Sequence, residues 1–493
     1  MNLNSRRVGG ALVVLLVALL VNLTVVQFFQ GPSLSTDEAN RRQLLAEYSR
    51  QRGPIVVGGN SVAQSVPTDD TLKFLRQYPG ADVYAPVTGY YSLYYGTSGI
   101  EQAENSVLSG NDDRLFGTRL NDILTGRDPK GGRVDLTLNP QAQQAAYDGL
   151  KNAGAAGAVV AIDPSTGAIL AAVSTPSYDP SQLSSHDANA IEAYYEQLSA
   201  DPSRPMLNRA LNQTYPPGST FKVVVSAAAL AAGKTPDSQI PSPDVYTLPD
   251  STTTLSNFEG ESCGNSTITL QQALTVSCNT AFAIQGVDLG TDAVKAEANK
   301  FGFDTDQQLE VPLPVTGSTV GPVVDDAALA QSSIGQRDVR MTPLQGALIA
   351  ATVANRGVQM TPYLVARELA PDLSVISETK PSERATVMAA DQADELGRMM
   401  TSVVANGTGK KAQISGVTVA GKTGTADTGF TSDSGDIPDA WFIGYAPAAS
   451  AKIAVAVIVE GAGSTTNETT GGDKSAPIAK AVMEAYLASG GGS

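Results

Sequence analysis

Ser219 and Lys222, a serine and a lysine three residues apart, are the first residues whose types and spacing could carry out a reaction. The Pro-Pro-Gly sequence at 216–218 ends an extended approach, and the apolar run from Val223 onward predicts a helix with Ser219 at its N-terminus. Residues at this spacing share one helical face. A serine hydroxyl needs a base to become a nucleophile, and a lysine amine serves when burial and the helix dipole lower its pKa. The alternative is a capping serine followed by an exposed lysine.

Ser277 and Asn279, on either side of Cys278, form a second motif. A hydroxyl and an amide at this spacing could relay a proton and bind a substrate carbonyl. Ser-x-Asn is a common pattern, and the chain holds another copy at 109–111 in sequence that favours a turn. The motif is therefore weak evidence when taken alone.

Lys422, Thr423, Gly424 and Thr425 form a third motif, directly after an apolar run at 417–421 that predicts a strand, so we expect the motif to lie on a strand or at its end. The ammonium and the two hydroxyls suit a substrate carboxylate, and the glycine permits close approach of a substrate backbone. Another Lys-Thr pair in the chain is followed by proline, which cannot donate a strand hydrogen bond.

The composition excludes several classes of protein. A chain of 493 residues suggests about three domains at most. The net charge of −16 argues against a nucleic-acid partner, because phosphate binding needs a basic face. One histidine and two cysteines disfavour the usual four-ligand zinc site, so we expect no metal and no cofactor. The single histidine, His186, lies in a polar loop where we expect solvent exposure, and a Ser-His-Asp enzyme is therefore improbable.

The N-terminal segment predicts a membrane anchor. Residues 8–29 are almost wholly apolar and uncharged, which is long enough for a helix to span a bilayer. Arg6 and Arg7 precede this segment and place residues 1–7 in the cytoplasm and the remainder outside. A cleaved signal peptide is the alternative, but the apolar run is long and no small-x-small cleavage site follows it.

The outward placement bears on the two cysteines, Cys263 and Cys278. An oxidising compartment favours a disulfide between them over two free thiols, although both states remain open.

The chain divides by composition into two folded parts. Residues 30–139, the pedestal domain, are rich in Tyr and Gly, contain strand-like segments at 56–57 and 134–138, and pair no nucleophile with a base. Residues 140–489 form a second domain, and 490–493 form a flexible Gly-rich tail. The second domain predicts an α+β fold, in which a five-stranded antiparallel sheet is assembled from both ends of the domain and flanked by helices. Its expected strands are 157–163, 168–174, 417–421, 440–445 and 452–460, and its expected helices include 141–153, 219–232, 343–355 and 476–488.

Taken in order, the three motifs resemble the signature of the penicillin-recognising serine acyltransferases. The resemblance covers roughly residues 50–488 and is closest to the class B penicillin-binding proteins, in particular the actinobacterial penicillin-binding protein A group. Outside the motifs it is carried by Arg52-Gly53-x-Ile55, Gly96-x-x-Gly99-Ile100-Glu101, Ile162-Asp163-Pro164-Ser165-Thr166-Gly167, Asn208-Arg209-Ala210, Ile334-Gly335-Gln336, Gly407-Thr408-Gly409 and Trp441-Phe442-Ile443-Gly444.

The resemblance implies roles in acylation for residues of the first two motifs. Ser219 would be the acylated nucleophile and Lys222 its base. Ser277 would pass the proton toward the leaving nitrogen, and Asn279 would hold a side-chain amide of the donor peptide. A disulfide at Cys278 would stiffen the loop that carries Asn279.

The third motif would bind the substrate. Lys422, Thr423 and Thr425, with Gly424 between them, would fix the terminal carboxylate of D-Ala-D-Ala or of a penicillin. Backbone N–H groups of Ser219 and Thr425 would form the oxyanion hole. Among nearby residues, Trp441 is expected to pack against the sheet. An acidic stretch at Asp427, Asp433, Asp436 and Asp439 is expected to form an exposed loop and is a candidate contact for an acceptor amine.

The resemblance therefore implies a peptidoglycan D,D-transpeptidase that cross-links stem peptides outside the cytoplasmic membrane and is a target of β-lactams. A D,D-carboxypeptidase would use the same residues and remains open. A β-lactamase is disfavoured because no separate deacylating carboxylate motif is identifiable, and a β-lactam sensor because only a few residues precede the membrane segment. We expect a separate membrane glycan polymerase and other division or elongation proteins as partners, and the resemblance favours division.

Overall fold

The computed structural model describes residues 3–25, 48–126, 128–305, 309, 311–426, 438–461 and 470–490. Helix α1 (Leu3–Thr24) covers most of the predicted membrane segment. Within the described residues, its stretch Arg7–Thr24 is the one helix long and apolar enough to cross a membrane, and its large apolar side chains are exposed. The predicted tail lies outside the described residues except for Gly490.

Five antiparallel strands form a sheet in the order β17-β18-β19-β7-β8, so the predicted α+β fold is confirmed. Two strands come from early in the second domain and three from its end, as expected. β17 is an edge strand, and the third motif lies on it, as expected. The strand begins at Ala420 and ends at Ala426, so its bounds differ from the predicted 417–421. The strand bounds are β7 Gly157–Ile162, β8 Ile169–Thr175, β17 Ala420–Ala426, β18 Asp439–Ala446 and β19 Ile453–Val459.

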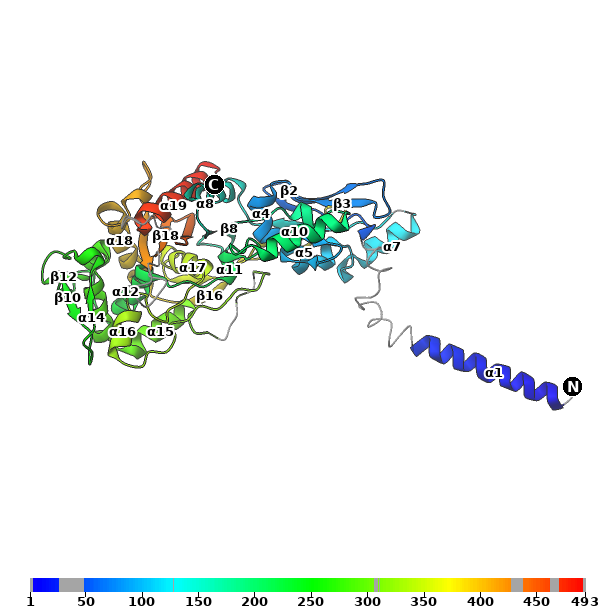
Figure 1. Ribbon diagram of the computed structural model, residues 1–493, viewed down its shortest axis with the longest axis horizontal. Helices are drawn as coiled ribbons and strands as arrows, with labels where there is room; N and C mark the ends of the chain where they lie inside the picture. Colours follow the sequence, from blue (N-terminus) through cyan, green and yellow to red (C-terminus); the bar gives the residue numbers. More distant parts are fainter. Residues whose placement is uncertain are drawn as a thin grey trace.

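Helices cover both faces of this sheet because its buried strands are apolar on both sides. Along β19, Val455, Val457 and Val459 pack into one core with α8 (Pro140–Ala153) and α19 (Gly471–Ala488). The alternate residues, such as Ala456 and Ile458, pack into a second core with α17 (Pro343–Ala354). Figure 1 shows α8 and α19 side by side over one face, with α17 on the other.

A helical lobe follows the first two strands in sequence and adjoins the edge of β17. Its central helix, α12, is buried along nearly its whole length, consistent with its Val- and Ala-rich sequence. The helices of this lobe are η3 Gly218–Phe221, α12 Lys222–Ala231, α13 Leu270–Val276, α14 Asn279–Leu289, α15 Thr291–Phe301, α16 Asp326–Ser332, α18 Ala390–Asn406 and η5 Lys410–Ala412. This part of the chain also contains three two-stranded sheets: β9 Gln239–Pro241 with β12 Thr267–Thr269, β10 Val245–Thr247 with β11 Thr254–Ser256, and β13 Val358–Met360 with β16 Glu383–Thr386.

A six-stranded sheet forms the pedestal, in the order β15-β14-β6-β1-β2-β3. β1 pairs with β6 in parallel, and the other pairs are antiparallel. The two strands at one end, β14 and β15, come from within residues 140–489, so the boundary drawn at residue 139 divides the sequence but not this sheet. The strands are β1 Ile55–Val57, β2 Asn60–Pro67, β3 Phe74–Gln77, β6 Arg133–Leu136, β14 Val365–Leu369 and β15 Val375–Glu378.

Short helices and one hairpin complete the pedestal and its junction with the five-stranded sheet. In the pedestal they are α4 Ala81–Thr88, β4 Tyr91–Ser92, β5 Gly96–Thr97, α5 Gly99–Ala103, α6 Asn105–Leu108, η2 Asp113–Leu115 and α7 Phe116–Leu124. At the junction they are α9 Pro180–Leu183, α10 Ala188–Ala200 and α11 Arg209–Asn212.

A buried ion cluster joins the two pedestal motifs that carry the family resemblance. The Glu101 carboxylate lies 2.5 Å from Arg52 Nε and 2.7 Å from Arg76 Nε, and it accepts a hydrogen bond from Tyr78 at 3.1 Å. Burial acts to raise the pKa of Glu101, but Arg76 and Arg52 outweigh it and hold the pKa below its ordinary value. Glu101 is therefore an ionised carboxylate in the buried interior of the pedestal.

His186 is not solvated as expected. Its ring is 19% exposed and pairs with Asp70, while Nε2 lies 3.2 Å from the carbonyl oxygen of Phe74. The loop before α10 thereby contacts the β2–β3 connection of the pedestal, a long-range contact that the local sequence does not encode.

We predict that Glu101→Ala lowers the free energy of unfolding by about 3–5 kcal/mol, because it leaves two buried guanidinium groups without their partner. Urea denaturation of the full-length protein in detergent measures the effect. Glu378→Ala, at an exposed carboxylate on β15 of the same sheet, is the matched control and should change stability by less than about 0.5 kcal/mol. Equal effects of the two substitutions would contradict a structural role for the cluster.

Candidate active site

Ser219 lies in the first helical turn, at the junction of η3 and α12, as the sequence predicts. The turn before it is held from two sides. Gly218 has a φ of 50° and donates its N–H to the Gly335 carbonyl at 3.0 Å. The buried Trp441 indole donates to the carbonyl of Pro216 at 3.0 Å, so this residue packs in the sheet as expected and also supports the turn.

Gly424 allows β17 to lie against this turn. A Cβ atom at Gly424 would stand 2.9 Å from the Pro217 carbonyl oxygen and 2.9 Å from Thr220 Cγ2, closer than side chains pack. The absent side chain thus faces the nucleophile turn. The sequence alone suggests that Gly424 allows a substrate backbone to approach. The structure adds a second reason for glycine here, which is the close packing of β17 against the turn.

Lys222 is fully buried and connects the first motif to the second. Its Nζ donates to the Ser277 carbonyl and to Asn279 Oδ1, each at 2.7 Å, and lies 3.4 Å from Ser277 Oγ. Burial, and after it the charge of Lys422, lowers the pKa of Lys222 well below its ordinary value. A neutral amine has two N–H bonds, and the two 2.7 Å contacts use both. Its lone pair is then free to accept a proton.

Lys422 approaches Ser277 from the opposite side. Its Nζ donates to Ser277 Oγ at 2.8 Å and to the Thr423 carbonyl at 2.9 Å, and burial lowers the pKa of Lys422 to about 7. Ser277 reaches this bridging position with a φ of 61°, at the end of α13. Non-glycine residues seldom adopt this conformation, and they concentrate at functional sites.

The second motif is held by a neighbouring loop. Asn257 Oδ1 accepts the N–H groups of Asn279 at 2.9 Å and of Thr280 at 3.1 Å. A disulfide joins Cys263 to Cys278, between Ser277 and Asn279 in sequence. The loop and the motif are thus tied together by hydrogen bonds and by a covalent bond.

The hydroxyls of the third motif have neighbours of their own. Thr423 Oγ1 lies 2.6 Å from Thr408 Oγ1, and the N–H of Gly471 lies 3.4 Å from Thr425 Oγ1. Thr408 belongs to a segment that the sequence marked only by family resemblance, with no role assigned. A hydrogen-bond partner of this kind has no local signal in the sequence.

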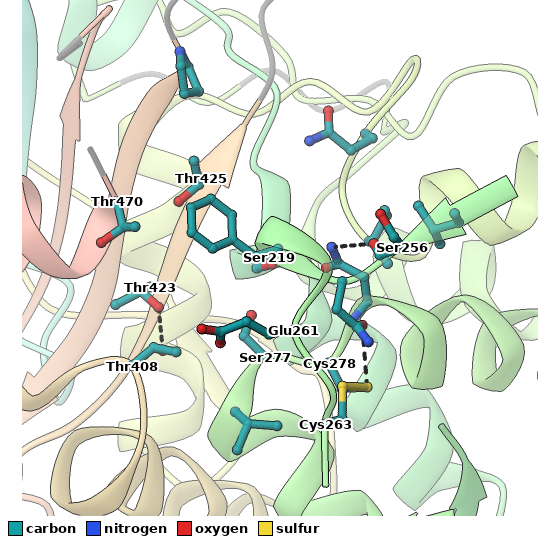
Figure 2. A pocket seen from close by; sticks show the side chains of 18 of the residues that line it. Ser219, Ser256, Glu261, Cys263, Ser277, Cys278, Thr408, Thr423, Thr425 and Thr470 are labelled. Carbon is teal, nitrogen blue, oxygen red and sulfur yellow. Dashed lines mark hydrogen bonds between the residues drawn. A yellow bond between two sulfur atoms is a disulfide. The ribbon is translucent and has the colours of Figure 1, made fainter. Parts of the chain in front are cut away.

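These residues surround one cleft of about 930 Å³. Figure 2 shows Ser219 between Thr425 and Ser277, with the Thr408–Thr423 pair and the disulfide at the sides. The side chains that line it come from all three motifs and their supports, including Ser219, Ser256, Asn257, Glu261, Ser277, Asn279, Gln336, Arg337, Thr408, Thr423 and Thr425.

The structure therefore brings the three motifs together and leaves the decoy sequences outside. Ser109 to Asn111 forms a turn in the pedestal, and Lys234 does not line the cleft. Among the described residues, the Ser219 hydroxyl forms no hydrogen bond with Lys222, whose donors point to the second motif. Catalytic hydrogen bonds are often long in the free enzyme and shorten when the substrate binds. The absence of a Ser219–Lys222 hydrogen bond is therefore compatible with catalysis.

Asp439 is the one residue of the predicted acidic stretch that the structure describes, and it does not lie in an exposed loop. Asp439 is buried in β18 and accepts the N–H of Gly461 at 3.0 Å, and burial raises the pKa of its carboxyl to about 7. The expected exposed position is therefore wrong for Asp439. Asp427, Asp433 and Asp436 lie outside the described residues.

Comparison with known proteins places this geometry in a family. A profile of the penicillin binding protein transpeptidase domain matches residues 157–484, and a profile of the penicillin binding protein A dimerisation domain matches residues 52–134. The chain is 51% identical to peptidoglycan D,D-transpeptidase PbpA of Mycolicibacterium smegmatis over 99% of this chain and 100% of that one. It is 48% identical to the PbpA of Mycobacterium tuberculosis, with 99% of each chain covered.

Comparison with solved structures supports the same family assignment. The ceftriaxone acyl-enzyme complex of penicillin-binding protein A from M. tuberculosis superimposes with a TM-score of 0.87 at 48% identity, covering 90% of this chain and 100% of that one. The penicillin G acyl-enzyme complex of the same protein gives a TM-score of 0.85 at 48% identity, covering 89% of this chain and 100% of that one. The chain is thus an enzyme of the serine D,D-transpeptidase type, and it belongs to the penicillin-binding protein transpeptidase family.

Proposed function

We propose that the enzyme cross-links peptidoglycan stem peptides through an acyl-enzyme on Ser219. The observation that carries this proposal is the buried network in which Lys222 and Lys422 both contact Ser277 beside the Ser219 turn. A neutral Lys222 supplies the base that the Ser219 hydroxyl needs.

Acylation releases the terminal D-Ala. The Ser219 oxygen bonds to the carbonyl carbon of the penultimate D-Ala as Lys222 takes the hydroxyl proton. The bond to the terminal D-Ala nitrogen then breaks, and the Ser277 hydroxyl passes a proton to that nitrogen while Lys222 restores it. The contacts of Ser277 with both lysines support this relay.

The third motif and Asn279 would bind the donor substrate. Lys422, Thr423 and Thr425 would hold the terminal carboxylate, and Asn279 the side-chain amide of the donor. The N–H of Ser219 lies at a helical start, where it has no partner within the helix, and with the N–H of Thr425 it would stabilise the oxyanion. Loss of one such donor typically raises the barrier by about 3 kcal/mol.

Transfer to an amine of a second stem peptide completes the cross-link, whereas transfer to water would give carboxypeptidation. The PbpA relatives are D,D-transpeptidases, which supports the first outcome. A β-lactam would acylate Ser219 in place of the donor, as ceftriaxone and penicillin G acylate the M. tuberculosis relative.

We place the catalytic domain outside the cytoplasmic membrane, anchored by α1 with residues 1–7 in the cytoplasm. The apolar length of α1 and the two arginines in its first turns, Arg6 and Arg7, support this topology. The resemblance to the penicillin-binding protein A group supports a role in cell division beside a separate membrane glycan polymerase.

Ser219→Ala should abolish covalent labelling by benzylpenicillin, because it removes the acylated oxygen. Intact mass spectrometry of the full-length protein in detergent measures the adduct. The wild type should gain the mass of one penicilloyl group, and Ser226→Ala, a buried serine on α12, should gain it as well. An adduct of the same mass on Ser219→Ala would contradict the assignment.

The rate of acylation by benzylpenicillin should rise with pH as Lys222 loses its proton and fall above about pH 7 as Lys422 loses its charge. The alkaline fall depends on the ligand carboxylate, so it should be absent with the methyl ester of the same penicillin. Stopped-flow rates between pH 5 and 9 test this. A rate that climbs through the whole range for both ligands would contradict the assignments of the two lysines.

A further inference from the structure

A five-residue span at 258–262 forms one wall of the cleft and is anchored at both ends. At its start, Asn257 accepts two N–H groups from the first turn of α14. At its end, Cys263 is bonded to Cys278 inside the second motif. The first three residues of the span form a short 3-10 helix, η4 (Phe258–Gly260), and the two anchors hold the side chains of the span beside the second motif.

Glu261 lies on this span and lines the cleft. Among the described residues that line the cleft, it carries the one carboxylate, and its side chain forms no ion pair or hydrogen bond with any described residue. In Figure 2 the Glu261 side chain points toward the side of the cleft that carries Thr408 and Thr423, and Ser277 lines the same cleft. An exposed carboxylate with no partner among the described residues is available to a ligand.

Among the described residues that line the cleft, the other charged side chains are the cations Arg337 and Arg340. Lys422, whose Nζ donates to Ser277 Oγ, adds a further cation, whereas Lys222 is the neutral amine. Arg337 is 3.2 Å from Asp338, which does not line the cleft, and Arg340 donates to main-chain carbonyls. This charge distribution favours the carboxylate of a donor peptide but repels an ammonium group, which is the form in which an aliphatic amine acceptor arrives at neutral pH.

We propose that Glu261 determines specificity for a cationic acceptor by binding its ammonium group beside the Ser219 ester. The inference rests on the proposed transpeptidase function. The bound ammonium gives one proton to solvent before attack. The amine nitrogen then bonds to the ester carbonyl carbon, the bond to Ser219 Oγ breaks, and a second amine proton returns through Lys222 to that oxygen. In this step Glu261 positions the acceptor and exchanges no proton with it.

The test separates acyl transfer to amine from acyl transfer to water. Full-length protein in detergent is given an acetylated D-Ala-D-Ala donor peptide, which has no free amine, with either a diamino-acid peptide or hydroxylamine as acceptor. The diamino-acid peptide is cationic at pH 7 and hydroxylamine is neutral. The readouts are the ratio of aminolysis to hydrolysis, the apparent KM for each acceptor, and the rate of Ser219 acylation.

Glu261→Gln should lower the aminolysis ratio about fivefold with the cationic acceptor, mainly through a higher KM, since Glu261 is solvent-exposed and its charge is screened. The ratio with hydroxylamine should not change. Glu261→Asp should recover part of the loss because it keeps the charge. Glu378→Gln, at an exposed carboxylate on β15, should match the wild type with both acceptors.

Three results would overturn the proposal. The first is an unchanged ratio for Glu261→Gln with the cationic acceptor. The second is an equal loss with both acceptors, and the third is a loss confined to the acylation step, since these would assign Glu261 to loop structure or to the donor. Absence of any acyl-enzyme on wild-type Ser219 would instead contradict the proposed function itself.

Discussion

Two lysine amines buried on either side of one serine hydroxyl set the conditions for the whole site. Lys222 lies 3.4 Å and Lys422 lies 2.8 Å from Ser277 Oγ, and both side chains are inaccessible to solvent. Two ammonium groups this close in a low-dielectric interior would repel each other strongly. The arrangement is stable when one amine is neutral, and a neutral amine is what a serine nucleophile requires. The same electrostatic constraint therefore accounts for both the base and the carboxylate-binding cation.

The fold places the two lysines and the serine close together by packing three separate elements against one another. The edge strand β17 brings Lys422, α12 brings Lys222, and the turn between α13 and α14 brings Ser277. Their close approach depends on Gly424, which leaves no atom between β17 and the turn before Ser219. The loop tied by the disulfide fixes the third element against the other two. Rigid supports of this kind keep catalytic groups within reach of one another.

The sequence predicted what depends on local patterns. Four of the five strands, β7, β8, β18 and β19, are largely apolar runs, and the helix at Ser219 follows a proline and glycine approach, so each could be located from nearby residues. The three motifs came together as expected because their order matches the family pattern. In contrast, β17 extends through the polar residues of the third motif, which a search for apolar runs does not include, because an edge strand can present hydroxyls to a cleft.

Contacts between distant segments could not be predicted in this way. β14 and β15 join the pedestal sheet from more than 200 residues away, as the pairing of Val365 with Leu136 shows. The neighbours Thr408, Asn257 and Glu261 reach the cleft only through tertiary packing. Likewise, Glu101 was marked by resemblance, but its pairing with Arg52 and Arg76 follows from the fold of the pedestal.

The most direct test of the central claim is the protonation state of Lys222. Nuclear magnetic resonance of protein labelled with ¹³C at the lysine ε-carbon follows each amine through a pH titration, and the Lys222→Ala variant identifies the signal. The structure predicts that Lys222 titrates far below the ordinary lysine pKa of about 10.4 and is neutral at physiological pH. A Lys222 signal that remains that of an ammonium group up to pH 10 would contradict the account.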